Sequence, residues 1–355
     1  MRYRETFTFP FQAKIPGLVN EFIDKEKGFG SFVKFFKRSL ILFFFRQSGL
    51  EKDAIRDVKK ILWINLSAPS LGDSLMDLSS RVLLNDCHLS LFTSLDNAHI
   101  FYDDEFFSEV FVKESEIKYQ NFDFIILDSY SSRTLRIKNK YFRKKKFTSM
   151  FGFFNGPEVN RVLFSFYRMN HLLRNRYSAD SISNLARCHM TIGTKDKQII
   201  EAMSLPESFI TIAIGGEWAY RTYKKWREVI DLIIDFNIKQ KIALVGSSNA
   251  LEIEKEIMDA NKHRDNLIYL VNKLSFKQTS AVISKSSFII CCDGGLMHAA
   301  HAVGTASISL IARLTPEMQL TNAIESSYLY DPENVNNIHC LDIFNKYKTL
   351  IGSVN

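Results

Sequence analysis

Short apolar runs alternate with amphipathic segments along most of this chain. In the second half, each apolar run is long enough for one buried strand and too short for a helix. The predicted strands are residues 209–214, 241–245, 267–270 and 288–292, and the helices predicted between them are residues 225–236, 250–260 and 275–284. Strands that alternate with helices of this length predict a parallel sheet.

The first half shows the same alternation. Residues 60–66 form its first convincing buried strand, a glycine-containing loop follows, and residues 74–84 have helical periodicity. Two more strands and one longer helical segment are expected at residues 89–93, 122–127 and 163–186. A strand, a glycine loop and a helix are the usual entry to a doubly wound sheet, so we predict an α/β protein with two Rossmann-like domains.

These patterns define four parts of the chain. The two domains are residues 59–190 and residues 191–335. A basic and aromatic extension, residues 1–58, precedes them, and residues 336–355 form a terminal helix. A length of 355 residues fits two domains that each bury their own core.

The net charge of +7 favours anionic partners, which include nucleic acid, a phospholipid surface and a phosphorylated substrate. The five cysteines are scattered without a C-x-x-C spacing, which indicates reduced thiols and neither a disulfide framework nor a zinc site. The N-terminus, with Arg2 and Arg4, has no signal-peptide core, and the longest apolar run, residues 40–45, is far too short to span a membrane. We therefore expect a cytoplasmic protein.

Two basic segments stand out from this composition. Residues 30–46 mix Phe, Leu and Ile with four basic side chains, which suits either an anionic membrane interface or an ordinary helix packed on the domain with its lysines in solvent. Residues 133–146 carry eight positive charges and no acid, more than solvation requires, so we expect contact with an anion. Aromatic residues lie among these charges, but no RNA-binding motif accompanies them, and nucleic acid is not expected as a partner.

The most informative stretch is residues 288–311. An apolar strand ends at Asp293, Gly294 and Gly295, a two-turn helix over residues 296–303 follows, and Gly304 stands where a helix cap is expected. Unpaired N–H groups at such a helix start face an anion, and glycine lets a phosphate approach the backbone. By itself this pattern fits a phosphate site or a plain tight turn equally well.

The sequence D-G-G-L-M-H-A-A-x-A-x-G-T resembles the D-T-G-L-M-H-L-A-A-A-L-G-T signature of glycosyltransferase family 9, the heptosyltransferase-like enzymes, with Gly294 in place of the usual Thr. Two more stretches resemble motifs of that family in the same order. Residues 61–73 end in the family's Gly-Asp at Asp73, and residues 212–226 contain its K-x-W segment, with Lys224 as the lysine. The resemblance covers roughly residues 60–325.

This resemblance implies the GT-B architecture, in which two Rossmann-like domains face a central cleft and the terminal helix returns to the first domain. It implies an inverting transfer in which the Asp73 carboxylate takes the proton of the acceptor hydroxyl. The alternative for Asp73 is an N-cap of the following helix. The donor-binding residues that it implies are Gly215, Gly216, Lys224, Asp293, Gly294, Gly295, Leu296 and His298.

The donor that the family implies is ADP-heptose, and the acceptor is the inner core of lipopolysaccharide, with no metal ion. An anionic, membrane-anchored acceptor would meet the basic run, for which we name Arg133, Arg136, Arg143 and Lys144. The enzyme would then work in the cytoplasm, peripherally on the inner membrane. Two alternatives stay open: a relative that uses another nucleotide sugar, such as UDP-N-acetylhexosamine, and a catalytically silent GT-B scaffold.

Overall fold

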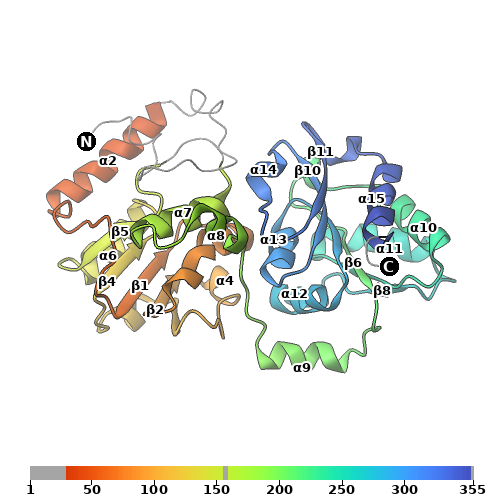
Figure 1. The fold of residues 1–355 in the computed structure, drawn as a ribbon, viewed down its shortest axis with the longest axis horizontal. Coiled ribbons are helices and arrows are strands. Elements are labelled where there is room, and N and C mark those ends of the chain that lie inside the picture. Colours follow the sequence, from red (N-terminus) through yellow and green to blue (C-terminus); the bar gives the residue numbers. More distant parts are fainter. Residues whose placement is uncertain (1–28, 155–158, 353–355) are drawn as a thin grey trace. The chain divides into compact units, whose positions relative to one another are not determined.

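The computed structural model describes residues 29–154 and 159–352, so most of the predicted extension, including Arg2 and Arg4, lies outside the described residues. The chain forms two compact units, Met1–Arg187 and Cys188–Asn355. Each unit contains its own parallel β-sheet with helices packed against it (Figure 1). Two α/β units were predicted, and the division lies close to the predicted boundary at residue 190.

The sheet of the first unit has five parallel strands in the order β3-β2-β1-β4-β5. Ile61 pairs with Leu89 on one side and with Phe124 on the other, which places β1 at the centre. The central strands are buried on both faces, as continuous apolar runs in parallel sheets are. The strands are β1 (Lys60–Asn65), β2 (His88–Thr93), β3 (Glu109–Phe111), β4 (Phe124–Leu127) and β5 (Lys146–Ser149).

Two helical segments predicted for the first unit are each divided in the structure, and α4, α5 and α6 were not predicted. The segment at residues 74–84 is two elements, because the α-helix ends at Leu78 and a 3₁₀ helix follows. The segment at residues 163–186 is also two helices, since Arg174 and Asn175 have positive φ values of 62° and 55°. The helices are α2 (Phe29–Phe44), α3 (Leu71–Asp77), η3 (Ser79–Leu84), α4 (Leu95–Ala98), α5 (Glu114–Ile117), α6 (Ser132–Tyr141), α7 (Arg161–Leu172) and α8 (Ala179–Leu185).

The second unit has six parallel strands in the order β11-β10-β9-β6-β7-β8. The strands are β6 (Ile210–Ala213), β7 (Ile242–Val245), β8 (Leu267–Tyr269), β9 (Ile289–Cys292), β10 (Ser307–Ala312) and β11 (Ser327–Asp331). The helices are α9 (Thr194–Ala202), η4 (Ala219–Arg221), α10 (Trp226–Phe236), η5 (Ser248–Ala250), α11 (Leu251–Ala260), α12 (Phe276–Lys285), α13 (Gly295–Ala302), α14 (Pro316–Gln319), η6 (Val335–Asn337) and α15 (Cys340–Gly352). All the strands and helices predicted for this half are present.

The terminal helix α15 packs within the second unit, against α10. Ile343 and Tyr347, one helical turn apart, lie fully buried in the core of this unit. The Tyr347 hydroxyl donates a hydrogen bond to Gln240 Oε1 at 3.0 Å. The sequence analysis predicted that this helix returns to the first domain. In the structure the apolar side of α15 instead completes the core of the second unit.

In both sheets the strand order reverses beside the first strand of the unit. The reversal falls between β1 and β4 in the first sheet and between β6 and β9 in the second. In doubly wound sheets, ligands bind outside the carboxyl ends of the strands at such a switch point. The loop that bears Asp73 follows β1, and the loops at Gly215 and Asp293 follow β6 and β9, so the predicted residues lie at the expected edges.

None of the described helices combines the length and the apolar character that crossing a bilayer requires.

Candidate functional site

The loop after β6 contains the predicted donor-binding residues Gly215 and Gly216. Asn249 donates a hydrogen bond from Nδ2 to the Gly216 carbonyl at 2.8 Å and so ties this loop to the start of α11. A Cβ at Gly215 would lie 2.7 Å from Asn249 Oδ1, and one at Gly216 would lie 2.8 Å from the Arg221 carbonyl oxygen. The packing of the loop on its own unit therefore requires glycine at 216, whereas a side chain at 215 would displace the Asn249 side chain.

Two neighbouring lysines before α10 have different surroundings. The backbone N–H of Lys224 donates to Asn336 Oδ1 at 2.9 Å, and its exposed ammonium contacts no polar group among the described residues. The Lys225 ammonium donates to the Asn336 carbonyl at 3.2 Å. Lys224 thus has a fixed backbone and an ammonium that is available to an anion. Trp226 is fully buried in the core of this unit.

The stretch after β9 has the predicted helix start. The first internal bonds of α13 run from the N–H groups of Met297 and His298 to the Gly294 carbonyl, so the amides of Gly295 and Leu296 precede them. Gly294 has a φ of 165°, which is extended backbone, and a Cβ there would meet no atom within 4 Å. Gly304 ends the helix with a φ of 82°, as its cap position predicted.

Two arginines that are not among the named donor-binding residues, Arg221 and Arg313, lie at the same sheet edge. Arg221 Nη1 is 3.4 Å from the buried carboxylate of Asp293, and its Nε donates to the Tyr220 hydroxyl at 3.0 Å. The guanidinium of Arg313 lies 3.8 Å from the centre of the Tyr220 ring. Arg313 follows β10 with a φ of 67°, a conformation that is costly for a residue with a side chain. Together with Lys224, these arginines give the donor edge a positive charge.

The two histidines of α13 are both buried. His301 Nε2 is 2.9 Å from the Ser307 hydroxyl and 3.3 Å from the Ser326 hydroxyl. Burial, and then the neighbouring His298, lower the pKa of His301 to about 3, so its ring is neutral at physiological pH. His301 therefore has a structural place in the core, and the donor role of His298 stays a prediction.

Asp73 lies in the first turn of α3 on the first unit. Ser70 is the N-cap, because its hydroxyl accepts from the Asp73 N–H at 3.2 Å, so the alternative in which Asp73 caps the helix is wrong. The carboxylate accepts a hydrogen bond from the Ser70 hydroxyl at 2.6 Å and lies 3.2 Å from Arg161 Nη1. The side chain is about one-fifth exposed, at 22%, and can reach a substrate. A carboxylate held in this way can accept a proton.

A buried carboxylate that the sequence analysis did not identify holds the loop before Asp73. Asp128, at the end of β4, accepts hydrogen bonds from the backbone N–H groups of Leu66 and Ser67 at 2.7 and 2.6 Å, and from the Thr134 hydroxyl at 2.9 Å. Burial raises its pKa, against these hydrogen bonds. The only sequence signal was an acid directly after a buried strand.

The basic run at residues 133–146 is divided by the structure. Arg136 and Lys140 on α6 form ion pairs with Glu114 at 2.6 and 2.8 Å, and the hydrogen bonds from Lys140 and Tyr141 lower the pKa of Glu114 to about 2. Lys138 is buried and donates hydrogen bonds to Gln47 and to a backbone carbonyl. Arg133, Arg143 and Lys144 are exposed, so these three predicted cations face solvent.

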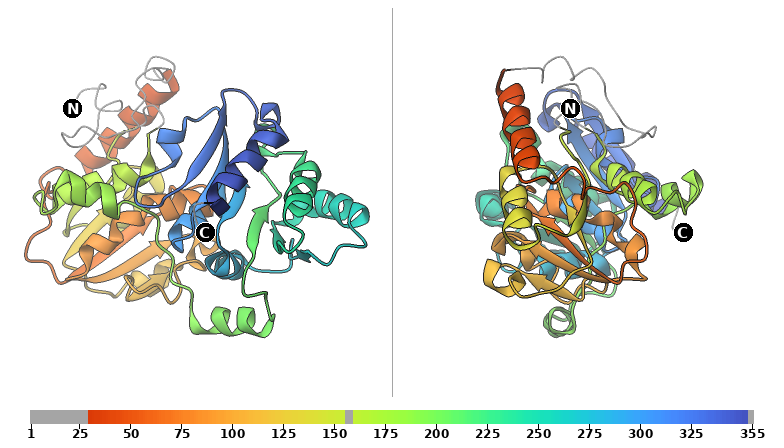
Figure 2. Two further views of the ribbon diagram at one scale, coloured as in Figure 1. Left: turned by 45° about the vertical axis from the view of Figure 1, so that its right-hand side comes forward. Right: turned by 90° about the vertical axis from the view of Figure 1, so that its left-hand side faces the viewer.

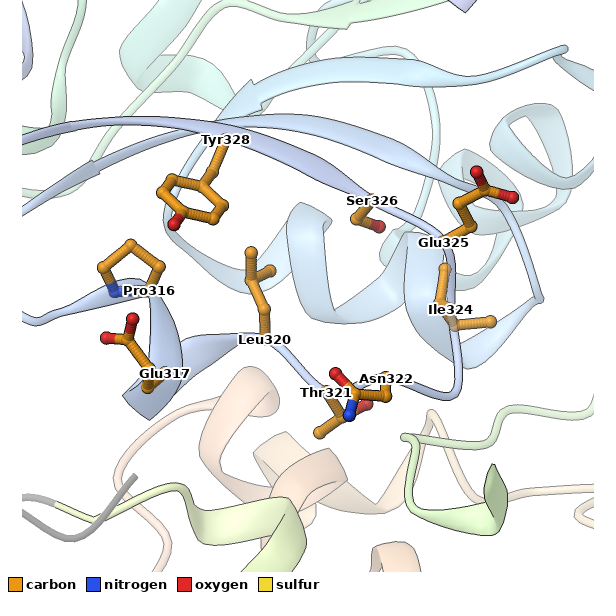
Figure 3. Close-up of a pocket in the computed structure, with 9 residues that line it drawn as sticks. All are labelled: Pro316, Glu317, Leu320, Thr321, Asn322, Ile324, Glu325, Ser326 and Tyr328. Carbon is orange, nitrogen blue, oxygen red and sulfur yellow. The ribbon is translucent and has the colours of Figure 1, made fainter. Parts of the chain in front are cut away.

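A pocket of about 370 Å³ lies elsewhere on the second unit (Figure 3). Its lining residues come from α14, from the loop that follows it and from the start of β11: Pro316, Glu317, Leu320, Thr321, Asn322, Ile324, Glu325, Ser326 and Tyr328. The lining contains two acids and no base, which disfavours a diphosphate. None of the predicted donor-binding residues belongs to it.

Among residues 29–154 and 159–352, no cluster of three or more His, Cys, Asp or Glu side chains is arranged to hold a metal ion. Asp104 is buried against Arg81, and its Oδ2 atom lies 2.6 Å from Arg81 Nη2. Its carboxylate is occupied by this ion pair.

Two units that each contain a parallel sheet covered by helices are typical of the GT-B architecture. The family model of glycosyltransferase family 9 (heptosyltransferase) matches residues 175–348, which contain all the predicted donor-binding residues. This match confirms the resemblance to the family that the motifs predicted, and it supports a glycosyl-transferring enzyme. A comparison with curated proteins gives no match.

Solved structures have the same fold. A glycosyltransferase family 9 protein from Veillonella parvula DSM 2008 is 13% identical, with a TM-score of 0.69 over 85% of this chain and 100% of that one. The ADP-heptose lipopolysaccharide heptosyltransferase II of E. coli is 15% identical, with a TM-score of 0.64 over 83% and 99%. The E. coli heptosyltransferase WaaC with ADP is 13% identical, with a TM-score of 0.60 over 81% and 99%. At these identities the likeness concerns the fold, and it confirms the GT-B prediction.

Proposed function

We propose that the chain is an inverting transferase that moves heptose from ADP-heptose to the inner core of lipopolysaccharide. One observation supports the donor side of this proposal. Strands β6 and β9 flank the switch point of the second sheet. The segment after β6 contains Lys224 with its available ammonium, and the amide groups at the start of α13 come directly after β9. ADP and an ADP-heptose analogue are the ligands of the similar E. coli WaaC structures, which supports an adenine nucleotide.

In the proposed reaction, Asp73 of the first unit removes the proton from the acceptor hydroxyl as the oxygen attacks the anomeric carbon. The bond between the sugar and the diphosphate breaks in the same step, so the configuration inverts. Lys224 and the amides of Gly295 and Leu296 stabilise the negative charge that grows on the leaving diphosphate. Arg221 and Arg313 add positive charge at the same edge. In this scheme these groups take the place of a metal ion.

The acceptor side rests on the charge of the first unit. We propose that the anionic core of the acceptor meets the exposed cations Arg133, Arg143 and Lys144, with Arg136 beside them in its ion pair with Glu114. An acceptor of this kind is anchored in a membrane, so we place the reaction in the cytoplasm at the inner membrane surface.

Thermal unfolding with ADP, UDP, GDP and CMP tests the donor. A nucleotide that binds only the folded state raises its stability, by about 2.7 kcal/mol at a hundred times its Kd. We expect a selective shift with ADP that Lys224→Ala reduces, because a charged hydrogen bond to phosphate contributes about 1.5–3 kcal/mol. Lys225→Ala is the matched control: it removes an equal charge whose ammonium is already engaged by Asn336, and it should retain the shift.

Each result decides between the alternatives. A selective shift with UDP would support sugar transfer and overturn ADP-heptose as the donor. No shift with any nucleotide would favour the silent scaffold. Transfer of heptose from ADP-heptose to a lipopolysaccharide core, measured directly, then tests the acceptor.

A further inference from the structure

Helix α2 has two apolar faces. Phe35 and Leu42 are buried in the core of the first unit, and the Phe35 ring lies 5.0 Å from that of Phe153. Much of the surface that faces water is apolar as well: the exposed apolar side chains of the helix are Phe29, Phe32, Val33, Phe36, Leu40, Phe43 and Phe44. A helix that only packs on its domain would have polar residues there.

The exposed side chains form one continuous stripe. Phe32, Phe36, Leu40 and Phe43 follow at helical spacing, and the Phe32 and Phe36 rings are stacked, with centroids 6.3 Å apart. Phe43 is 74% exposed. In both views of Figure 2, α2 lies on the outside of the first unit. Exposed apolar surface of this extent marks an interaction site on a soluble protein.

The charges around this stripe determine which partner fits. Residues 29–50 contain four basic residues and no acid, and Lys34 and Lys37 are exposed beside the stripe. A second copy docked on this face would bring like charges together. An anionic phospholipid bilayer offers an apolar interior for the aromatic rings and negative headgroups for the lysines. The long lysine side chains let the ammonium groups reach those headgroups.

The basic turn after α6 adjoins the end of the same helix. The Arg143 guanidinium lies 5.7 Å from the centre of the Phe45 ring, and Gln47 Nε2 donates to the Arg143 carbonyl at 3.3 Å. Lys144 is exposed next to it. The cations of this turn thus extend the positive surface beyond the C-terminal end of α2.

We propose that α2 lies in the interface of an anionic phospholipid bilayer, with its exposed stripe among the upper acyl chains and Lys34, Lys37, Arg143 and Lys144 at the headgroups. The proposal does not depend on which sugar is transferred. It assigns the aromatic segment to the membrane-interface alternative that the sequence left open, while Phe35 and Leu42 keep the helix on its domain.

Flotation of the full chain with phosphatidylcholine vesicles, with and without phosphatidylglycerol, tests this. We expect binding to the anionic vesicles. Phe36→Asp and Phe43→Asp should each lower partitioning at least about tenfold, since each puts a charge in place of a ring that the proposal inserts among the acyl chains. Lys34→Gln and Lys37→Gln should each weaken binding about fivefold at low salt. Tyr119→Asp is the matched control, because Tyr119 is 85% exposed on the same unit and is not part of the stripe, and it should bind as wild type does.

A second readout does not rely on loss. Phe43→Trp should show a blue-shifted emission with anionic vesicles and quenching by brominated lipids. The proposal is overturned if wild type binds no vesicles, if Phe36→Asp and Phe43→Asp bind as well as Tyr119→Asp, or if the chain forms a dimer that these variants dissociate while vesicles are ignored. Melting temperatures of the variants identify any that have lost their fold.

Discussion

Gly294 stands where the family signature has Thr, and the structure allows the missing side chain to be restored. The backbone there is extended, and a Cβ would meet no atom within 4 Å. Gly and Thr are similar as N-caps, and removing a glycine lowers the entropy of the unfolded chain, worth about 0.4–1 kcal/mol. Gly294→Thr should therefore keep or slightly raise the melting temperature.

The restored hydroxyl should strengthen donor binding. It would stand at the start of α13, beside the amides proposed to bind the diphosphate, and one hydrogen bond to a charged group contributes about 1.5–3 kcal/mol. Taking the lower value, we expect ADP to bind about tenfold more tightly. Trp218 offers the readout, since it is exposed on the loop after β6 whereas the other two tryptophans, Trp63 and Trp226, are fully buried.

Gly294→Val separates the hydroxyl from the bulk of the side chain, because Val and Thr have the same shape. We expect Val to bind ADP no better than wild type does. Equal affinities of the Thr and Val variants would refute a hydroxyl contact with the donor. A marked loss of stability in both would show that position 294 does not have the open, extended backbone described here.

Three further predictions concern the first unit. Asp73→Asn should lower kcat by about 10²–10⁴-fold and leave the ADP-induced thermal shift intact, as expected for a general base; an equal loss of ADP binding would assign Asp73 to the donor site instead. Asp104→Ala should lower the free energy of unfolding by about 3–5 kcal/mol in urea, because it leaves the buried Arg81 without its partner, and replacing both residues by apolar ones should recover much of it. Burial lowers the pKa of Lys138 to about 8, so the unfolded chain binds more protons above that pH and this residue makes stability rise from about pH 8 towards pH 10. Burial also raises the pKa of the Cys291 and Cys292 thiols, and these groups make stability fall as the pH rises. The quantity to measure is therefore the difference in the free energy of unfolding between wild type and Lys138→Met as a function of pH. If this difference stays constant from pH 8 to pH 10, the prediction is contradicted.

The sequence predicted the strands well where both faces of a strand are buried. Residues 60–66 and 288–292 are continuous apolar runs, and such runs are typical of central parallel strands. The edge strands β3, β5 and β11 were not predicted. β3 and β11 are short and only partly buried, and β5 is a short strand that begins at the last lysine of the basic run. The helix breaks at Leu78 and Arg174 were not predicted, because neither position has the proline or glycine that usually indicates the end of a helix.

The candidate site could be predicted only where local chain geometry determines it. A strand, two glycines and a helix fix the backbone at Gly294, so this part followed from the sequence. Arg313 and Asp128 act through contacts with residues far away in the chain, Tyr220 and Leu66, and no local pattern identifies such contacts. For the same reason the basic run looked uniform in the sequence, although Lys138 is buried and Arg136 is held by Glu114.

The packing of α15 has a consequence for the order in which this protein is made. Ile343 and Tyr347 fill the core of the second unit, so that core stays incomplete until the ribosome has synthesised the chain as far as α15. The first unit has all its core residues once Arg187 has emerged, and domains fold as units from the N-terminus during synthesis. A nascent chain would therefore have a folded first unit, with the aromatic stripe of α2 exposed, before α15 has been synthesised and the second unit can complete its core.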